Sequence, residues 1–302
     1  MLRSYKENYM KNHIGKIAPL ALALMAPAAV SADDLVSVLE EQMAMVNGTL
    51  SAEGKNFRVL MAEAITQGDE AGITVYAKNV GNKRLTAQFV EGDPRRTWSY
   101  YGDTDKDSIT YSIDEVDGQP LFGGASAVDA SMAIDNAMAT WAAVQCSSMP
   151  IVNSGLTSET GVIAALNGLG GSFDINADIM HAGFTDIDFA GGVLGVTFTL
   201  VFTSGGEYTD VDNDGYLDTA FREIYYDPSW AWNVDGNNID IESVAVHEAG
   251  HGLSQGHFGM VKVGNNGLKA SPRAVMNALY TGPYRDLAGT DLGGHCGMWA
   301  NW

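Results

Sequence analysis

Residues 240–258, DIESVAVHEAGHGLSQGHF, constrain this 302-residue chain more than any other stretch, because they hold three of its six histidines. His247 and His251 are four residues apart, so on a helix they lie on one face, about one turn apart. That spacing lets two imidazoles bind the same Zn²⁺ ion. The glycines that follow are poor helix formers, so we expect the helix to end soon after His251 and the chain to bring His257 back as a third ligand.

Glu248 directly follows the first of these histidines. It is close enough to reach a water molecule on the metal without binding the metal itself. Three protein ligands leave the fourth position open for that water, which is the arrangement of a catalytic zinc and not of a structural one. We expect the zinc to lower the pKa of the water toward about 7 and Glu248 to act as the general base that takes its proton. The alternative is a helix whose histidines bind no metal.

Residues 247–257 resemble the zinc signature of the metzincin metalloproteases, H-E-x-x-H-x-x-G-x-x-H. One position departs from the signature, because Ser254 stands where the family has a turn glycine. A serine is strained in the backbone conformation of such a turn, unless Gly252 or Gly256 makes the turn instead. The resemblance implies a zinc-dependent endopeptidase that cleaves protein or peptide substrates and holds its zinc at the three histidines.

Residues 271–280, SPRAVMNALY, look like the metzincin Met-turn, in which a methionine packs beneath the metal site. On this resemblance Met276 takes that place, and Tyr280 matches a tyrosine that lines the substrate pocket of the matrixins. Residues 222–227 are similar to the matrixin strand that forms a substrate-binding edge. The implied fold is α+β, with a twisted, mainly parallel sheet over the active-site helix and an irregular C-terminal subdomain, within residues 121–302.

Residues 210–218, DVDNDGYLD, form a second candidate metal site. Carboxylates at alternate positions, followed by a turn glycine, offer the hard oxygen ligands that Ca²⁺ prefers. Phe221 stands where an EF-hand loop has its closing glutamate, so we expect an EF-like calcium loop without the EF-hand helices. The alternative is a solvated acidic turn. The expected ligands are Asp210, Asp212, Asp214 and Asp218, with the backbone carbonyl of Tyr216.

Residues 1–32 are expected to be a secretory signal peptide. A basic start is followed by an uncharged run, residues 17–30, that is too short and too broken by prolines to span a bilayer, and a small-residue cleavage pattern ends at Ala32. We therefore expect a secreted protein, extracellular or periplasmic, that is monomeric and has no membrane anchor. In an oxidising compartment Cys146 and Cys296 most simply form one disulfide, and the alternative is two buried thiols.

The charge of the chain restricts its partners. With 17 Lys and Arg against 37 Asp and Glu, the formal net charge is −20. Such a chain repels a phosphate backbone, which argues against nucleic acid and against anionic membrane surfaces as partners.

The part of the chain between the signal peptide and the catalytic domain, residues 33–120, is expected to form a small strand-rich region. It contains no cysteine, so the thiol that blocks the zinc in latent matrixins is not available from it. Whether the region is a removable pro-segment, an inhibitor or a permanent partner stays open. The hydrophobic patterns predict helices over 34–46 and from Ser126, and strands over 57–65, 72–78, 84–90, 108–113, 174–180, 193–203 and 221–226.

Two other functions are compatible with the sequence. One is a different H-E-x-x-H hydrolase whose third ligand is an aspartate, for which Asp286 and Asp291 are available. The other is a non-catalytic, calcium-dependent surface or adhesion module on the same fold. The intact Glu248 argues against the second, because a binding module has no need of a general base.

Overall fold

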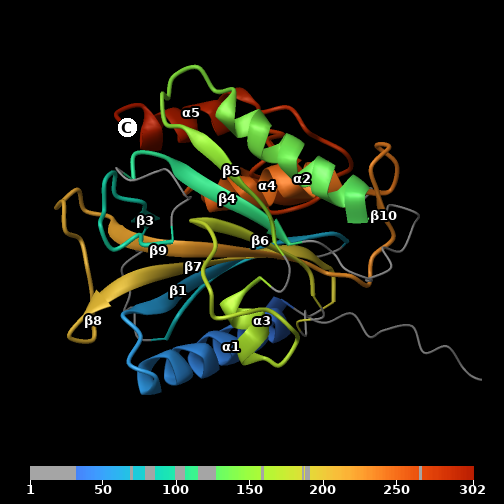
Figure 1. The fold of residues 1–302 in the computed structure, drawn as a ribbon. Helices are drawn as coiled ribbons and strands as arrows, with labels where there is room; N and C mark the ends of the chain where they lie inside the picture. Colours follow the sequence, from blue (N-terminus) through green and yellow to red (C-terminus); the bar gives the residue numbers. More distant parts are fainter. Residues whose placement is uncertain are drawn as a thin grey trace, which may run out of the picture.

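The computed structural model describes residues 32–302, apart from 69–70, 79–85, 99–105, 115–126, 158–159, 186, 188–190 and 265–266. Within these residues the chain is an α+β protein with a nine-stranded mixed sheet and five helices (Figure 1). Residues 1–31 of the predicted signal peptide lie outside the described residues. No helix among the described residues is both long and apolar enough to cross a membrane.

The main sheet has the strand order β2-β1-β7-β9-β6-β4-β5, with β3 paired to β9 and β8 paired to β7. Its strands are β1 (Phe57–Thr66), β2 (Ile73–Tyr76), β3 (Ala87–Gln88), β4 (Ile109–Asp114), β5 (Ile151–Thr157), β6 (Ile179–Phe184), β7 (Val193–Ser204), β8 (Glu207–Tyr208) and β9 (Leu217–Tyr226). Two small sheets are formed by β10 (Trp232–Asn233) with β11 (Ile239–Asp240) and by β12 (Met260–Gly264) with β13 (Gly267–Ser271).

The prediction of a mainly parallel sheet was wrong. The four strands β9, β6, β4 and β5 run parallel to one another. In contrast, β7 pairs antiparallel with β9, and β1 pairs antiparallel with both β7 and β2. The sheet is mixed because β7 runs antiparallel to β9, and two strands from the 33–120 region, β1 and β2, continue it beyond β7 with further antiparallel pairs. The prediction that residues 222–227 form an edge was also wrong, since β9 lies between β7 and β6 inside the sheet.

Helices cover both faces of this sheet. In Figure 1, α2, α4 and α5 lie on one side of the sheet, and α1 and α3 lie on the other. Apolar side chains alternate between the two sides along the strands, as Ile224 and Tyr225 do on β9, and each side has its own buried cluster. The helices are α1 (Ala32–Ala52), α2 (Ala127–Ala142), α3 (Val162–Leu166), α4 (Ile241–Gly252) and α5 (Gly289–Trp299).

The first helix is longer than predicted. It was predicted over residues 34–46, but α1 continues through Asn47 and Gly48 to Ala52. The Asn47 side chain does not turn its own backbone, because its amide donates to the Val59 carbonyl at 2.9 Å and its oxygen accepts from the Val59 amide at 2.7 Å. A tertiary contact with β1 thus replaces the local turn.

The predicted disulfide is confirmed. Cys146, which follows α2, is bonded to Cys296 within α5. The bond joins two segments that are 150 residues apart in sequence. It therefore fixes the C-terminal helix to the helix layer that covers the sheet.

Candidate metal centre

The helix α4 carries the first two histidines and is held firmly at its start. The Asp240 carboxylate caps it by accepting from the Ser243 amide at 3.0 Å, and Arg285 is paired with the same carboxylate. Farther along, the indole of Trp141 donates to the Val246 carbonyl at 2.8 Å. The helix ends at Gly252, as its glycines predict, so His247 and His251 leave one rigid element from one face.

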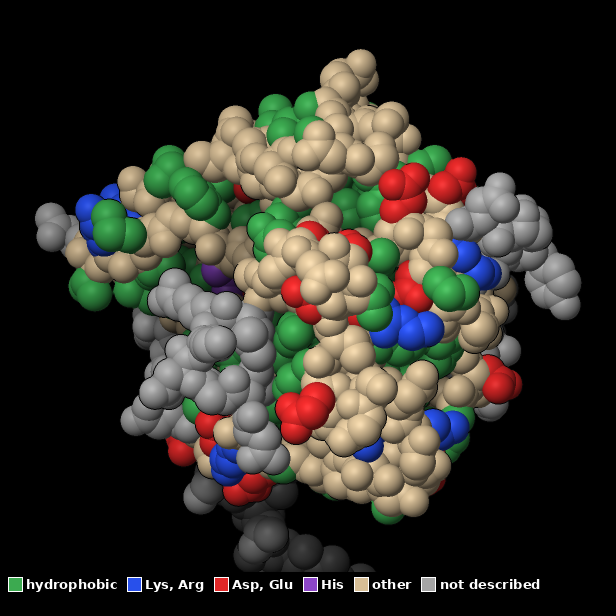
Figure 2. Space-filling model, turned by 90° about the vertical axis from the view of Figure 1, so that its left-hand side faces the viewer, with side chains coloured by type: hydrophobic (Ala, Val, Ile, Leu, Met, Phe, Trp, Pro, Cys, Tyr) green, Lys and Arg blue, Asp and Glu red, His purple; other side chains and the backbone are tan. Residues whose placement is uncertain are grey.

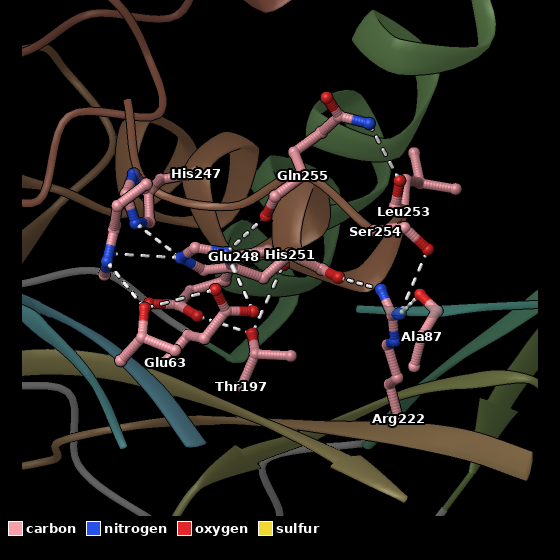
Figure 3. A network of polar contacts seen from close by, with 12 residues as sticks. Glu63, Ala87, Thr197, Arg222, His247, Glu248, His251, Leu253, Ser254 and Gln255 are labelled. Carbon is pink, nitrogen blue, oxygen red and sulfur yellow. Dashed lines mark hydrogen bonds and ion pairs between the residues drawn. The ribbon is translucent and has the colours of Figure 1, made fainter. Parts of the chain in front are cut away.

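The three predicted histidines converge on one point (Figure 3). The Nε2 atom of His251 lies 3.0 Å from Nε2 of His247 and 3.3 Å from Nε2 of His257. The outer nitrogens are engaged, since Nδ1 of His247 is 2.7 Å from the Val275 carbonyl and Nδ1 of His251 is 2.7 Å from the Gln255 carbonyl. A carbonyl only accepts, so each Nδ1 carries the hydrogen and each Nε2 directs its lone pair at the common point.

This donor set fits a zinc ion. Burial, followed by the proximity of His251, holds the pKa of both His247 and His257 well below the usual histidine range, so both are neutral ligands. Burial also disfavours the charged form of His251, but the Glu63 carboxylate raises the pKa of that imidazole. Together the three residues form a group that could hold a metal ion.

The turn that brings His257 to the site is made by Ser254. Ser254 has φ 65, in the left-handed region, and neither Gly252 nor Gly256 has a positive φ, so the serine itself makes the turn and neither glycine takes its place. The Ser254 hydroxyl accepts a hydrogen bond from Arg222 at 3.0 Å. The same guanidinium donates to the His251 carbonyl. The buried arginine therefore supports the strained turn that a glycine would make without help.

Met276 packs against α4, the helix that carries His247 and His251. Its side chain is buried and contacts Gly250, where an added Cβ would lie 2.3 Å from the methionine Sδ. Asp291 holds the surrounding turn, because its carboxylate accepts from the backbone amides of Val275 and Met276 at 2.9 and 3.1 Å.

The two aspartates considered as third ligands lie elsewhere. Asp291 is occupied by backbone amides of the Met-turn, as just described. Asp286 lines a pocket beside the Cys146–Cys296 disulfide. The described residues thus offer His257, and neither aspartate, as the third member of the metal group.

Glu248 lies beside the metal group and is fully buried. One carboxylate oxygen accepts from the Thr197 hydroxyl at 2.5 Å, and the other has no hydrogen-bond partner among the described residues. Burial raises the pKa of Glu248 to about 7. Gly195 on β7 leaves room for this carboxylate, because a Cβ there would lie 2.9 Å from its Oε1 atom.

Two hydrogen bonds of its hydroxyl group hold the Tyr280 side chain in position. That hydroxyl accepts from the Asp240 amide at 2.9 Å and donates to the Asn238 carbonyl at 3.1 Å. The side chain is thereby fastened to the start of α4, while the Tyr280 amide donates to the Thr66 carbonyl on β1 at 2.8 Å. Its role in a substrate pocket stays a prediction.

Sequence reasoning missed two residues of the 33–120 region that contact the histidines. The Glu63 carboxylate on β1 lies 3.3 Å from Nδ1 of His251, and the Thr74 hydroxyl on β2 lies 3.3 Å from Nδ1 of His257. Burial by itself would raise the pKa of Glu63, but the adjacent His251 holds that pKa below its usual range. The signal that could have found Glu63 is one carboxylate within the otherwise apolar stretch of β1.

The metal centre is almost closed to solvent. His247, Glu248 and His251 are buried, and among the described histidines only His257 is partly exposed. Figure 2 shows a histidine side chain within a recess on one face of the molecule.

The structure divides the five predicted calcium ligands. Asp210, Asp212 and Asp214 form a group at the surface that could hold a metal ion. Asp218 is not a member of this group: its buried carboxylate pairs with Arg95 at 2.7 Å and accepts from the Val211 amide at 3.1 Å. The Tyr216 amide donates to the Asp214 carboxylate at 2.7 Å, and binding of Ca²⁺ to this loop stays a prediction.

Comparison with known proteins adds no assignment. No protein-family model matches the chain, and no curated protein is similar to it.

Proposed function

We propose that this protein is a secreted zinc-dependent endopeptidase of the metzincin type, with matrixin-like features. The observation that carries the proposal is the convergence of three imidazole nitrogens, from His247, His251 and His257, beside the buried carboxyl group of Glu248. Three histidine ligands leave a position open for water, as in catalytic zinc sites. The disulfide is consistent with export to an oxidising compartment.

In this proposal the histidines bind the metal and Glu248 moves the proton. Bound zinc would act as a Lewis acid that polarises the scissile carbonyl and acidifies a water molecule. Glu248 would take a proton from that water and donate it to the leaving amine. A carboxyl group with a pKa of about 7 is suited to both tasks near neutral pH. The Thr197 hydroxyl fixes one carboxylate oxygen and so orients the base.

The test is to remove the base and keep the metal. Glu248→Gln is expected to retain one zinc ion per chain and to hydrolyse casein about 10²–10⁴-fold more slowly. Glu41→Gln, at an exposed position of α1, is the matched control and should leave both values unchanged. A Glu248→Gln protein that cleaves casein at the wild-type rate would contradict the proposal.

The aspartate-ligand alternative is tested by metal content. We expect His257→Ala to lose zinc and Asp291→Ala to retain it in the molecules that fold, because Asp291 is bonded to backbone amides. The opposite result would favour the other class of hydrolase.

The calcium-dependent binding module is supported only by the surface group of Asp210, Asp212 and Asp214. A peptidase activity that zinc chelation abolishes, and that added zinc restores, would decide against that alternative.

A further inference from the structure

The strand β1 passes between two segments that border the metal centre. On one side it pairs antiparallel with β7 along its whole length. On the other side its last residue, Thr66, accepts from the Tyr280 amide and forms a parallel bridge with Leu279. Just before β2, the Gly72 amide donates to the Ala278 carbonyl at 2.5 Å. Backbone of β1 and of the residue before β2 thus lies between β7 and residues 278–280.

The position that β1 occupies beside β7 is level with Glu248. The Glu248 carboxylate bonds to Thr197 and packs against Gly195, and both residues belong to β7. Opposite them on β1 stand Glu63, in register with Thr197, and Ile65, in register with Gly195. An extended peptide that presented its scissile bond to Glu248 would bind as a strand added to β7, which is the position that β1 occupies.

Side chains fasten β1 and β2 to the metal centre. Glu63 contacts His251, Thr74 contacts His257, and the Thr74 hydroxyl donates to Glu63 at 3.4 Å. Figure 3 shows Glu63 and Thr197 pointing from their strands toward His251 and Glu248. The Glu63 side chain is buried, so its negative charge is poorly screened and would be attracted to a cation held by the histidines.

We infer that the hairpin of β1 and β2, residues 57–66 and 73–76, is an autoinhibitory segment that occupies the peptide-binding groove beside β7, and that Glu63 fastens it there. Hydrolysis then requires β1 to separate from β7. The inference rests on the proposed endopeptidase function. Glu63 is a positioning residue in this scheme and takes no part in the chemistry.

The inhibitory part is confined to this hairpin and does not extend to the whole of residues 33–120. The strand β4 belongs to the same region, but it lies between β6 and β5 in the interior of the sheet. Loss of β4 would divide the sheet on which the site is built. The hairpin lies at the end of the sheet and can leave without dividing it.

A reversible cross-link tests whether β1 must move. Ala64 and Val196 stand opposite each other on β1 and β7, and both point to the α1 side of the sheet, away from Glu248. Directly opposite residues of antiparallel strands are close enough for a disulfide. The double variant Ala64→Cys/Val196→Cys is compared with its two single variants, each in the oxidised state and after mild reduction. Mass spectrometry checks that the reduction leaves the Cys146–Cys296 disulfide intact.

Two measurements are made on the cross-linked protein. Binding of a fluorescein-labelled casein peptide is followed by anisotropy in proteins that also carry Glu248→Gln, and casein hydrolysis is followed in proteins that retain Glu248. We expect the oxidised double variant to bind and hydrolyse at least 10-fold less well than its reduced form. The single variants should not respond to the reductant.

A second variant tests the fastening role of Glu63. Glu63→Lys places a positive charge beside the histidines and should loosen the hairpin. We expect zinc to pass to the chelator 4-(2-pyridylazo)resorcinol at least 10-fold faster than from the wild type, and casein hydrolysis to increase. Glu41→Lys makes the same charge change at an exposed site of α1 and should behave as the wild type does.

The outcomes separate the inference from the proposed function. If oxidised and reduced double variants bind the peptide and hydrolyse casein equally well, the autoinhibition is wrong and the peptidase stands. If the cross-link controls peptide binding but neither form hydrolyses casein, the groove assignment stands and the peptidase is wrong. Zinc release from Glu63→Lys at the wild-type rate would overturn the role of Glu63.

Discussion

Met276 packs so closely against Gly250 that a Cβ on residue 250 would lie 2.3 Å from the methionine Sδ. Trp141 approaches the same point, with its Cζ2 atom 2.8 Å from that position. The glycine between the two proposed zinc ligands of α4, His247 and His251, is therefore required by packing. It lowers helix propensity, but it lets α4 lie directly against the methionine and the indole.

We expect Gly250→Ala to lower the free energy of unfolding by about 1–3 kcal/mol, because the added methyl group overpacks the contact with Met276. It should also weaken zinc binding, since α4 carries two ligands. Gly48→Ala is the matched control: Gly48 is exposed within α1 with nothing near its Cβ position, and alanine there should raise stability by about 0.5–1 kcal/mol. Urea unfolding measures the free energy of unfolding of both variants. An equal change in the two variants would contradict the close packing of Met276 on Gly250.

Two substitutions of Ser254 separate its hydrogen bond from its backbone strain. Ser254→Ala loses the bond to Arg222 and keeps an unfavourable φ, so we expect a loss of about 1.5–3 kcal/mol in the free energy of unfolding. Ser254→Gly loses the same bond but relieves the strain, and should be more stable than Ser254→Ala by about 1 kcal/mol. The reverse order in chemical denaturation would show that the φ of Ser254 is not strained.

Removal of the disulfide should lower stability without removing the metal site. We expect the double variant Cys146→Ser/Cys296→Ser to lose about 2–5 kcal/mol, because the bond closes a long loop and restricts the unfolded chain. Thermal unfolding should show the loss, whereas zinc content should stay at one ion per folded chain. Unchanged unfolding would indicate that the two ends of the loop stay together without the bond.

His181 should make stability depend on pH. Burial lowers the pKa of His181 to about 3, against about 6.5 in an unfolded chain. Between these values the unfolded state binds more protons, so the free energy of unfolding falls as the pH is lowered, and the full stability is present above about pH 6.5. From pH 7 to pH 5 this group alone should account for about 2 kcal/mol.

The measurement is urea unfolding at both pH values for the wild type and for His181→Gln, in which the titrating group is absent. We expect the variant to show a smaller pH dependence, by about 2 kcal/mol over this interval. Other groups titrate in both proteins, so the difference isolates His181. Identical dependence in the two proteins would show that His181 is protonated in the folded state at pH 5.

Local patterns were enough to predict much of this molecule. The spacing of His247, Glu248 and His251 follows from one turn of helix, so the sequence placed them correctly relative to one another. The two cysteines had only one possible intramolecular partner each, and that pair is bonded. The strands expected in β1, β7 and β9 are present because their apolar runs suit a sheet buried on both faces.

Neighbours that are distant in sequence could not be predicted in the same way. Whether residues 222–227 form an edge depends on which strands pair with β9. The sequence of a single strand contains little information about its pairing partners. The contact of Glu63 with His251 joins residues 188 positions apart, through the register of β1 on β7. The amino-acid sequence alone determined the spacing of the candidate metal ligands on α4, because helix periodicity is local; only the tertiary structure decided what covers these ligands, because strand pairing depends on the whole fold.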